Sequence, residues 1–228
     1  MVQVDPEVPE LVAGDRLSRA EFERRYAAAR GLPKAELIEG MVYVPSPVRV
    51  RHGAPSFDLI GWLFAYRVAT PGVSGGDDTT VRLEAENELQ PDAHLRIDVG
   101  GQSRVDADDY IEGAPELAVE VTASTASYDM HAKKRAYQRN GVREYLVWRT
   151  DDEAIDWFAL HRGRYRRLKP GPDGVLRSDV FPGLWLDPAA LLSGDLATVL
   201  RVLQRGLSSP EHAAFVKRLA RPRRRGAR

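Results

Sequence analysis

The chain contains no cysteine among its 228 residues, so disulfide bridges and cysteine-bound zinc are excluded. It also has no apolar run that approaches the roughly 20 residues needed to span a bilayer as a helix. The opening residues, MVQVDPEVPELVAGD, are acidic and contain proline, without the basic and then apolar pattern of a signal peptide. These absences favour a cytoplasmic protein with no membrane partner.

No net charge remains either, because 33 basic residues balance 33 acidic ones. The balance hides an asymmetry, since residues 217–228 carry one lysine, six arginines and no acid. Such a tail could contact the phosphates of a nucleic acid. A solvated, disordered terminus is the interpretation that the composition favours.

What is present indicates a globular domain, because 43% of the residues are hydrophobic and 29% are charged. Ser18 and Glu21 form a capping-box pattern that predicts a helix over 18–30. Glu39-Gly40 between apolar arms predicts a tight hairpin over 37–44. Helical spacing of apolar residues predicts a buried helix over 55–69, followed by a loop at 72–78.

Strands are expected at 79–85, 90–99, 117–122 and 144–148, with a polar connection at 100–113 and a helix over 127–140. A second hairpin is expected around residues 161–163, and short helices at 188–193, 195–206 and 210–219. The predicted domains are an irregular lead-in at 1–17, a core domain at 18–170, a helical extension at 171–216 and the basic tail at 217–228. This order of elements predicts an α/β or α+β fold with a mixed sheet flanked by helices.

Two acids and a lysine in this plan suit metal-assisted cleavage of a phosphodiester. Asp92 begins one strand, and Glu120 interrupts the most apolar strand of the chain. Carboxylate oxygens are the ligands that Mg²⁺ prefers, so both residues are candidate metal ligands. Lys133 lies one helix away from Glu120 and could stabilise negative charge that develops during the reaction.

Each candidate also has a structural interpretation. Asp92 after Pro91 is typical of a turn that enters a strand. Glu120 is costly to bury unless it is paired or bound to metal, but it could face solvent on an edge strand. Asp129 and Lys133, four residues apart on a helix, could form an ordinary surface salt bridge, and Tyr137 on the same face is interpreted as a core residue.

With these residues in view, the chain resembles the bacterial Uma-type restriction endonuclease family, within the PD-(D/E)XK nuclease superfamily. The resemblance covers about residues 18–168 and is strongest over GAPELAVEVTASTASYDMHAKKRAYQRNGVREYLVW. ELIEGMVYVPSP resembles the opening hairpin of the family, followed by His52 where a histidine is usual. LQPDAHLRI resembles its Pro-Asp strand.

The resemblance implies a restriction-endonuclease-like fold, a divalent metal such as magnesium, and DNA as the partner. It implies Asp92 and Glu120 as metal ligands and Lys133 as the catalytic lysine, with Lys134 as the weaker candidate. Glu36 would add a further acid, with Glu39 as the alternative. A homodimer is a plausible assembly, because enzymes that cut both strands often pair two sites.

Some positions depart from the pattern. Thr122 stands where the superfamily usually has lysine, and Ala123 replaces a proline in the following turn. Neither change removes a proposed catalytic group. The leading hypothesis is a metal-dependent DNA endonuclease. The alternative is a catalytically inactive nucleic-acid-binding or regulatory protein on a nuclease scaffold. Under either hypothesis, a basic cluster around the second hairpin could hold phosphates, and it consists of Arg143, His161, Arg162, Arg164, Arg166 and Arg167.

Overall fold

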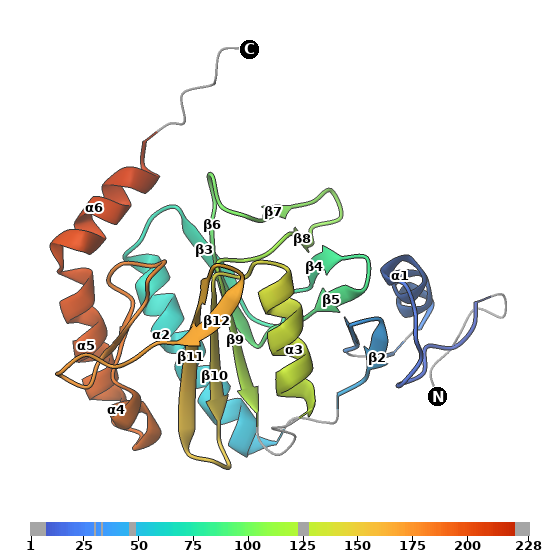
Figure 1. Cartoon of the computed structure of the whole chain (residues 1–228), viewed down its shortest axis with the longest axis horizontal. Helices are drawn as coiled ribbons and strands as arrows, with labels where there is room; N and C mark the ends of the chain where they lie inside the picture. The colour runs from blue at the N-terminus through green and yellow to red at the C-terminus, as the bar shows by residue number, and fades with distance from the viewer. Residues whose placement is uncertain (1–7, 30, 33, 46–48, 123–127, 222–228) are drawn as a thin grey trace.

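The computed structural model describes residues 8–29, 31–32, 34–45, 49–122 and 128–221 (Figure 1), and the side chains of 128–130 lie outside this description. The helices are α1 (Arg19–Ala28), α2 (Val50–Val68), α3 (Tyr128–Arg139), α4 (Pro188–Leu192), α5 (Leu196–Leu207) and α6 (Pro210–Leu219). The strands are β1 (Glu36–Ile38), β2 (Met41–Tyr43), β3 (Val73–Gly76), β4 (Val81–Glu84), β5 (Asn87–Leu89), β6 (Ala93–Ile97), β7 (Arg104–Val105), β8 (Ile111–Glu112), β9 (Leu117–Thr122), β10 (Glu144–Arg149), β11 (Ala154–His161), β12 (Arg164–Arg167), β13 (Leu176–Arg177) and β14 (Trp185–Leu186).

The main sheet has six strands in the order β12-β11-β10-β9-β6-β3. β9 and β10 run parallel, whereas the other neighbouring pairs in this sheet run antiparallel. Two adjacent parallel strands need a crossover connection, and α3 supplies it. Figure 1 shows α3 beside these strands. The expectation of a mixed sheet flanked by helices is confirmed.

β9 is buried on both faces, as its nearly continuous apolar run predicts. Val119 packs in one apolar cluster with Leu59 of α2, and Ala118 packs in another with Ala136 of α3. Because side chains alternate along a strand, Glu120 points to the side of α3. The helix that follows β9 therefore lies over the one acid within that strand.

A second six-stranded sheet has the order β2-β1-β5-β4-β8-β7, and its strands all come from the first half of the sequence, between Glu36 and Glu112. The predicted hairpin is confirmed as β1 and β2, with Ile38 opposite Met41 and a two-residue turn between them. The predicted first helix is confirmed as α1, where the Ser18 hydroxyl accepts a hydrogen bond from the Glu21 backbone N–H. Both elements depend on local chemistry that the sequence displays.

Three expectations were wrong. α2 begins at Val50, five residues before the expected start, and contains Pro55. Proline disfavours the interior of a helix because it has no backbone N–H to donate. The residues before Pro55 are helical all the same, and two contacts anchor them, Arg51 with Asp151 and His52 with Asp92. The expected loop at 72–78 contains strand β3, and the expected connection at 100–113 contains β7 and β8, because neighbouring strands supply their hydrogen bonds.

The C-terminal part of the chain shares the core of the main sheet. Phe181, Leu184 and Leu203 belong to the same apolar cluster as Leu59 of α2. The expected late helices are confirmed as α4, α5 and α6. The first residues of the predicted basic tail, 217–219, form the end of α6, and residues 222–228 lie outside the described part. None of the described helices combines the length and apolar character needed to cross a membrane.

Candidate active site

The two predicted metal ligands lie on paired backbone segments. β6 and β9 pair antiparallel with Ala93 opposite Val119, which places Asp92 opposite Glu120. The Asp92 Oδ2 atom accepts a hydrogen bond of 2.7 Å from the backbone N–H of Val121. The pairing of the strands therefore fixes where these two carboxylates stand.

Lys133 of α3 connects Glu120 with a third carboxylate. Its Nζ atom lies 3.1 Å from Glu120 Oε1 and 3.0 Å from Glu120 Oε2. The same Nζ atom lies 3.0 Å from Oε1 of Glu36, which belongs to β1 in the second sheet. The backbone N–H of Gln90 also donates to Glu36 Oε1, at 2.7 Å. The site thus joins both sheets and α3 around one ammonium group.

Tyr137, one helical turn after Lys133, completes the surroundings of Glu120. Its hydroxyl donates a hydrogen bond of 2.7 Å to Glu120 Oε1. Residues four apart lie on the same face of a helix, so α3 presents both donors to the same carboxylate. The orientation of the Glu120 side chain is therefore fixed by two groups from one helix.

Burial dominates the electrostatics of Glu120. Burial raises the pKa of Glu120 to about 7, against the opposing charge of Lys133 and with the negative charges of Asp92 and Glu36 adding to the rise. Burial alone would lower the pKa of Lys133, but Glu120, Glu36 and Asp92 outweigh it and raise that pKa well above its usual value. Lys133 therefore remains a cation at neutral pH, among carboxyl groups that repel one another.

Asp92 has a different environment, which includes His52 of α2. The His52 Nε2 atom lies 3.5 Å from Asp92 Oδ2. Burial alone would raise the pKa of Asp92, but the hydrogen bond with His52, the charge of Lys133 and the Val121 amide together lower it. The hydrogen bond with Asp92 in turn raises the pKa of His52, although burial opposes the rise. The two opposed acids therefore differ, with Asp92 the more readily ionised.

The geometry separates the candidates that the sequence left open. Glu36 contacts Lys133, whereas Glu39 forms a salt bridge of 2.7 Å with the exposed Arg135. Lys133 faces the acids, whereas the Nζ atom of Lys134 lies 3.4 Å from the centroid of the Phe158 ring. The structure thus brings together Asp92, Glu120, Lys133 and Glu36, while the side chain of Asp129 lies outside the described part.

The sequence profile of the Uma2 family, which carries the description "Putative restriction endonuclease", matches residues 19–189. This chain belongs to the Uma2 family. The match confirms the resemblance, and it includes every residue of the candidate site. No match was found among the curated proteins.

Among solved structures, the Uma2 chain is similar to one from Anabaena variabilis ATCC 29413 that is described as "a putative nuclease belonging to DUF820". The TM-score is 0.61 at 13% sequence identity, and the match covers 78% of this chain and 98% of the other. At this level of identity, the likeness shows a shared fold.

Two residues of the Uma2 site were not assigned a role from the sequence. Tyr137 was interpreted as a core residue, and it is buried, but its hydroxyl binds Glu120. Its spacing of four residues from Lys133 was the available signal. His52 was noted only by its position in the family pattern, and no sequence rule connects it with Asp92, forty residues later.

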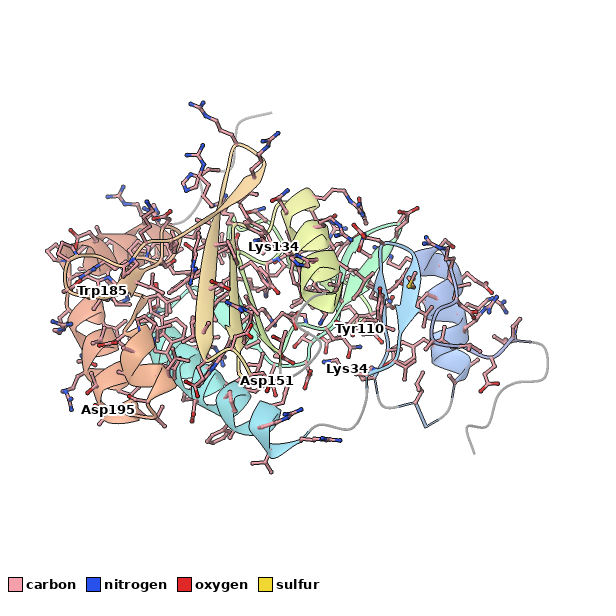
Figure 2. All side chains as sticks on the ribbon, turned by 60° about the horizontal axis from the view of Figure 1, so that its bottom comes forward. Lys34, Tyr110, Lys134, Asp151, Trp185 and Asp195 are labelled. Atoms are coloured by element: carbon pink, nitrogen blue, oxygen red, sulfur yellow. The ribbon has the colours of Figure 1, made fainter. Side chains whose placement is uncertain are left out.

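The basic cluster around the second hairpin lies away from the acids. In the main sheet Glu144 pairs with Leu117 and with Ala159, so the hairpin turn lies beyond the end where β9 begins. Glu120 lies toward the opposite end of that strand. Figure 2 shows the hairpin projecting from the body, with nitrogen-tipped side chains near its turn. A hollow of about 540 Å³ lined by Arg143, His161 and Asp179 lies at this end.

Within the described residues, no three histidine, cysteine, aspartate or glutamate side chains are arranged as a ready metal site. The ammonium of Lys133 contacts Glu36 and Glu120 directly. The chemistry of the donors still suits a hard divalent cation, because Asp92 and Glu120 offer carboxylate oxygens from directly paired positions of neighbouring backbone segments. A cation shared by these two groups would also relieve the repulsion that contributes to the raised pKa of Glu120.

Proposed function

We propose that this Uma2 chain is a magnesium-dependent endonuclease that hydrolyses phosphodiester bonds in DNA. The observation that carries the proposal is the convergence of Glu120 and Glu36 on Lys133, with Asp92 opposite Glu120. These four groups come from β1, the residue before β6, β9 and α3, and they are largely buried. A buried cluster of charged groups is expensive to maintain for stability alone, which favours a functional role.

Asp92 and Glu120 are the residues that would hold the metal ion. When bound there, Mg²⁺ would polarise a phosphoryl oxygen and lower the pKa of a bound water. Asp92 is ready for this role because its lowered pKa keeps it ionised. Glu120 has a pKa of about 7, so protons compete with a cation for it below neutral pH.

Lys133 would act as a fixed positive charge. Its raised pKa keeps the proton on Nζ at neutral pH, which suits stabilisation of a negatively charged phosphoryl group rather than proton abstraction. Glu36 also contacts this ammonium, and the Tyr137 hydroxyl holds the Glu120 carboxylate in place. These contacts hold the charged groups in fixed positions before a substrate binds, as a preorganised site requires.

Glu120→Gln tests the proposal, because it removes the charge of one ligand while nearly preserving its shape. We expect the wild-type chain to cleave plasmid DNA only when Mg²⁺ is added, and the variant to lose that cleavage by about a hundredfold. Glu39→Gln is the matched control, since Glu39 lies outside the site, and it should cleave like the wild type. A duplex RNA of the same sequence tests the preference for DNA.

Calorimetric titration with Mg²⁺ gives a second measurement that does not depend on turnover. Wild-type protein should bind the ion, and Asp92→Asn should weaken binding at least tenfold, because a ligand charge is lost. Cleavage retained by Glu120→Gln would refute the assignment of the ligands. Nucleic acid binding without Mg²⁺ binding or cleavage would instead support the inactive scaffold protein.

A further inference from the structure

An exposed apolar stripe runs along the full length of α2. It consists of Val50, Ala54, Phe57, Gly61, Phe64 and Val68, which alternate in steps of four and three residues. The opposite face of the helix carries the buried residues of the core. On the stripe, Phe57 is 77% exposed and Phe64 is 59% exposed. Steps of four and three are the spacing by which one helix packs against another.

No charged residue interrupts the stripe, although charged residues border it. Arg51, Asp58 and Arg67 occupy positions beside the six stripe residues and leave an apolar centre with a polar margin. Apolar centres with polar rims are typical of protein interfaces. Large aromatic side chains that remain exposed in a row, rather than singly, mark a surface with a partner.

The stripe is complementary to itself when a second copy is placed antiparallel. About a centre at residue 59, Phe57 lies opposite Gly61 of the second copy, and Ala54 lies opposite Phe64. Each phenylalanine therefore meets a glycine or an alanine, while Val50 meets Val68 of the second copy. A two-fold interface matches a surface with itself, so a second copy of the chain is the partner that this pairing fits.

A hollow beside the stripe fits the same arrangement. It has a volume of about 140 Å³ and is lined in part by Ile60, Leu63, Phe64 and Arg67 of α2. Ile60 and Phe64 flank Gly61, the position that faces Phe57 of the second copy. The hollow thus offers space for an aromatic ring on the side where the antiparallel pairing delivers one.

We propose that two copies of the chain form a two-fold symmetric dimer through antiparallel packing of their α2 helices. With 19 residues, α2 is about 28 Å long, so two antiparallel copies can contact each other along the whole stripe. Burial of the exposed phenylalanine and valine side chains drives the association. The homodimer expected from the sequence would then associate through the apolar stripe of α2.

The dimer would place two candidate sites on either side of one axis. His52, which contacts Asp92, lies seven residues from the centre of the stripe, so the two copies of His52 would stand about 20 Å apart along the helices. A duplex has its two strands related by local two-fold axes, as the two sites would be. This consequence rests on the proposed function, whereas the dimer itself does not.

Sedimentation equilibrium of the full chain across a wide concentration range tests the assembly. The wild type should approach twice the mass of one chain, which is 25.4 kDa. Phe57→Glu combined with Phe64→Glu should shift the protein to monomer with its thermal unfolding retained, since both side chains are exposed. Val99→Glu, at a position 66% exposed elsewhere on the chain, is the control and should remain dimeric.

Disulfide cross-linking tests the antiparallel register. Because the chain has no native cysteine, any disulfide must form between the introduced residues. Ala54→Cys mixed with Phe64→Cys should form a disulfide-linked pair under mild oxidation, while either variant alone should not. Self-linking of each variant alone would overturn the antiparallel arrangement. A monomeric wild type, or a dimer that survives the double glutamate variant, would overturn the interface, and neither outcome depends on whether the chain cleaves DNA.

Discussion

The candidate site gathers its carboxyl groups around the buried ammonium group of Lys133. Lys133 contacts Glu120 and Glu36 at 3.0 Å each, and Asp92 adds to the negative potential around it. The repulsion among three carboxyl groups is tolerable only while that positive charge is present, because buried like charges are otherwise neutralised or expelled. Stability and proposed chemistry therefore depend on the same atom.

Lys133→Met should destabilise the protein by about 3–5 kcal/mol, the usual consequence of removing one partner from a buried ion pair. It should also abolish Mg²⁺-dependent cleavage. Lys134→Met is the matched control, because Lys134 lies over the Phe158 ring and should cost about 1 kcal/mol or less. Urea unfolding and plasmid cleavage check both variants. Equal stability of the two variants would contradict this account of the site.

Among the elements, those with local signals were predictable from the sequence. The hairpin of β1 and β2 turns at Glu39 and Gly40, which both adopt positive φ values, 52° and 75°. Turns of this kind need glycine or a tolerant residue at those two places, so the sequence identifies them. The Ser18 cap of α1 and the apolar run of β9 are further cases in which a few neighbouring residues determine the element.

Elements that depend on distant partners were not predictable. β3 has the sequence VSGG, with little side-chain pattern, and it exists because β6 pairs with its backbone. A side chain at Gly75 would approach the carbonyl oxygen of His94 to 2.5 Å, so the close pairing itself requires glycine there. No window of sequence around Gly75 contains that information.

The candidate site divides along the same line. Asp92, Glu120 and Lys133 could be nominated because they belong to adjacent strands and the helix between β9 and β10. The choice of Glu36 over Glu39 depends on which side of the β1–β2 hairpin meets α3, which is a tertiary contact. The contact between His52 and Asp92 similarly depends on where the first turns of α2 lie.

At the junction of α5 with the segment before β14, two backbones approach too closely for a side chain. A Cβ atom at Gly206 would lie 2.2 Å from the carbonyl oxygen of Gly183 and 2.8 Å from the Trp185 ring. Gly206→Ala should therefore destabilise the fold by about 1–3 kcal/mol through overpacking, although alanine favours helices. Arg205→Ala on the exposed side of α5 should change stability by about 0.5 kcal/mol or less. Thermal unfolding of both variants measures the difference, and a neutral or stabilising Gly206→Ala would show that the backbones can separate.

For the molecule as a whole, the C-terminal part is bound to the main sheet by polar contacts as well as by its apolar core. Trp62 Nε1 of α2 donates to the Trp185 carbonyl at 3.1 Å, and the Tyr66 hydroxyl donates to the Pro182 carbonyl at 3.0 Å. These bonds fasten the segment between β13 and α4 to the helix that carries His52. The surface that supports the proposed dimer is therefore held in place from its inner side.

Glu144, at the start of β10, binds the same C-terminal segment from the sheet. Its carboxylate accepts hydrogen bonds from the Ser178 hydroxyl, the backbone N–H groups of Asp179 and Val180, and Trp157 Nε1. Burial nevertheless raises the pKa of Glu144 to about 7. The folded protein thus holds a proton on this carboxyl group at pH values where the unfolded chain has released it.

The sign of the resulting pH dependence follows from this difference. Since the folded state binds the proton more tightly, the contribution of Glu144 to the free energy of unfolding is fully present below about pH 4.5 and is lost as pH rises through about 7. The glutamine side chain in Glu144→Gln cannot ionise, so the variant does not lose this stability as the pH rises. The free energy of unfolding of the variant, relative to that of the wild type, should therefore rise by on the order of 3 kcal/mol between about pH 5 and about pH 8. Urea unfolding of both proteins at the two pH values measures the change, and a difference between them that stays constant or reverses with pH would show that the four donors keep Glu144 ionised throughout.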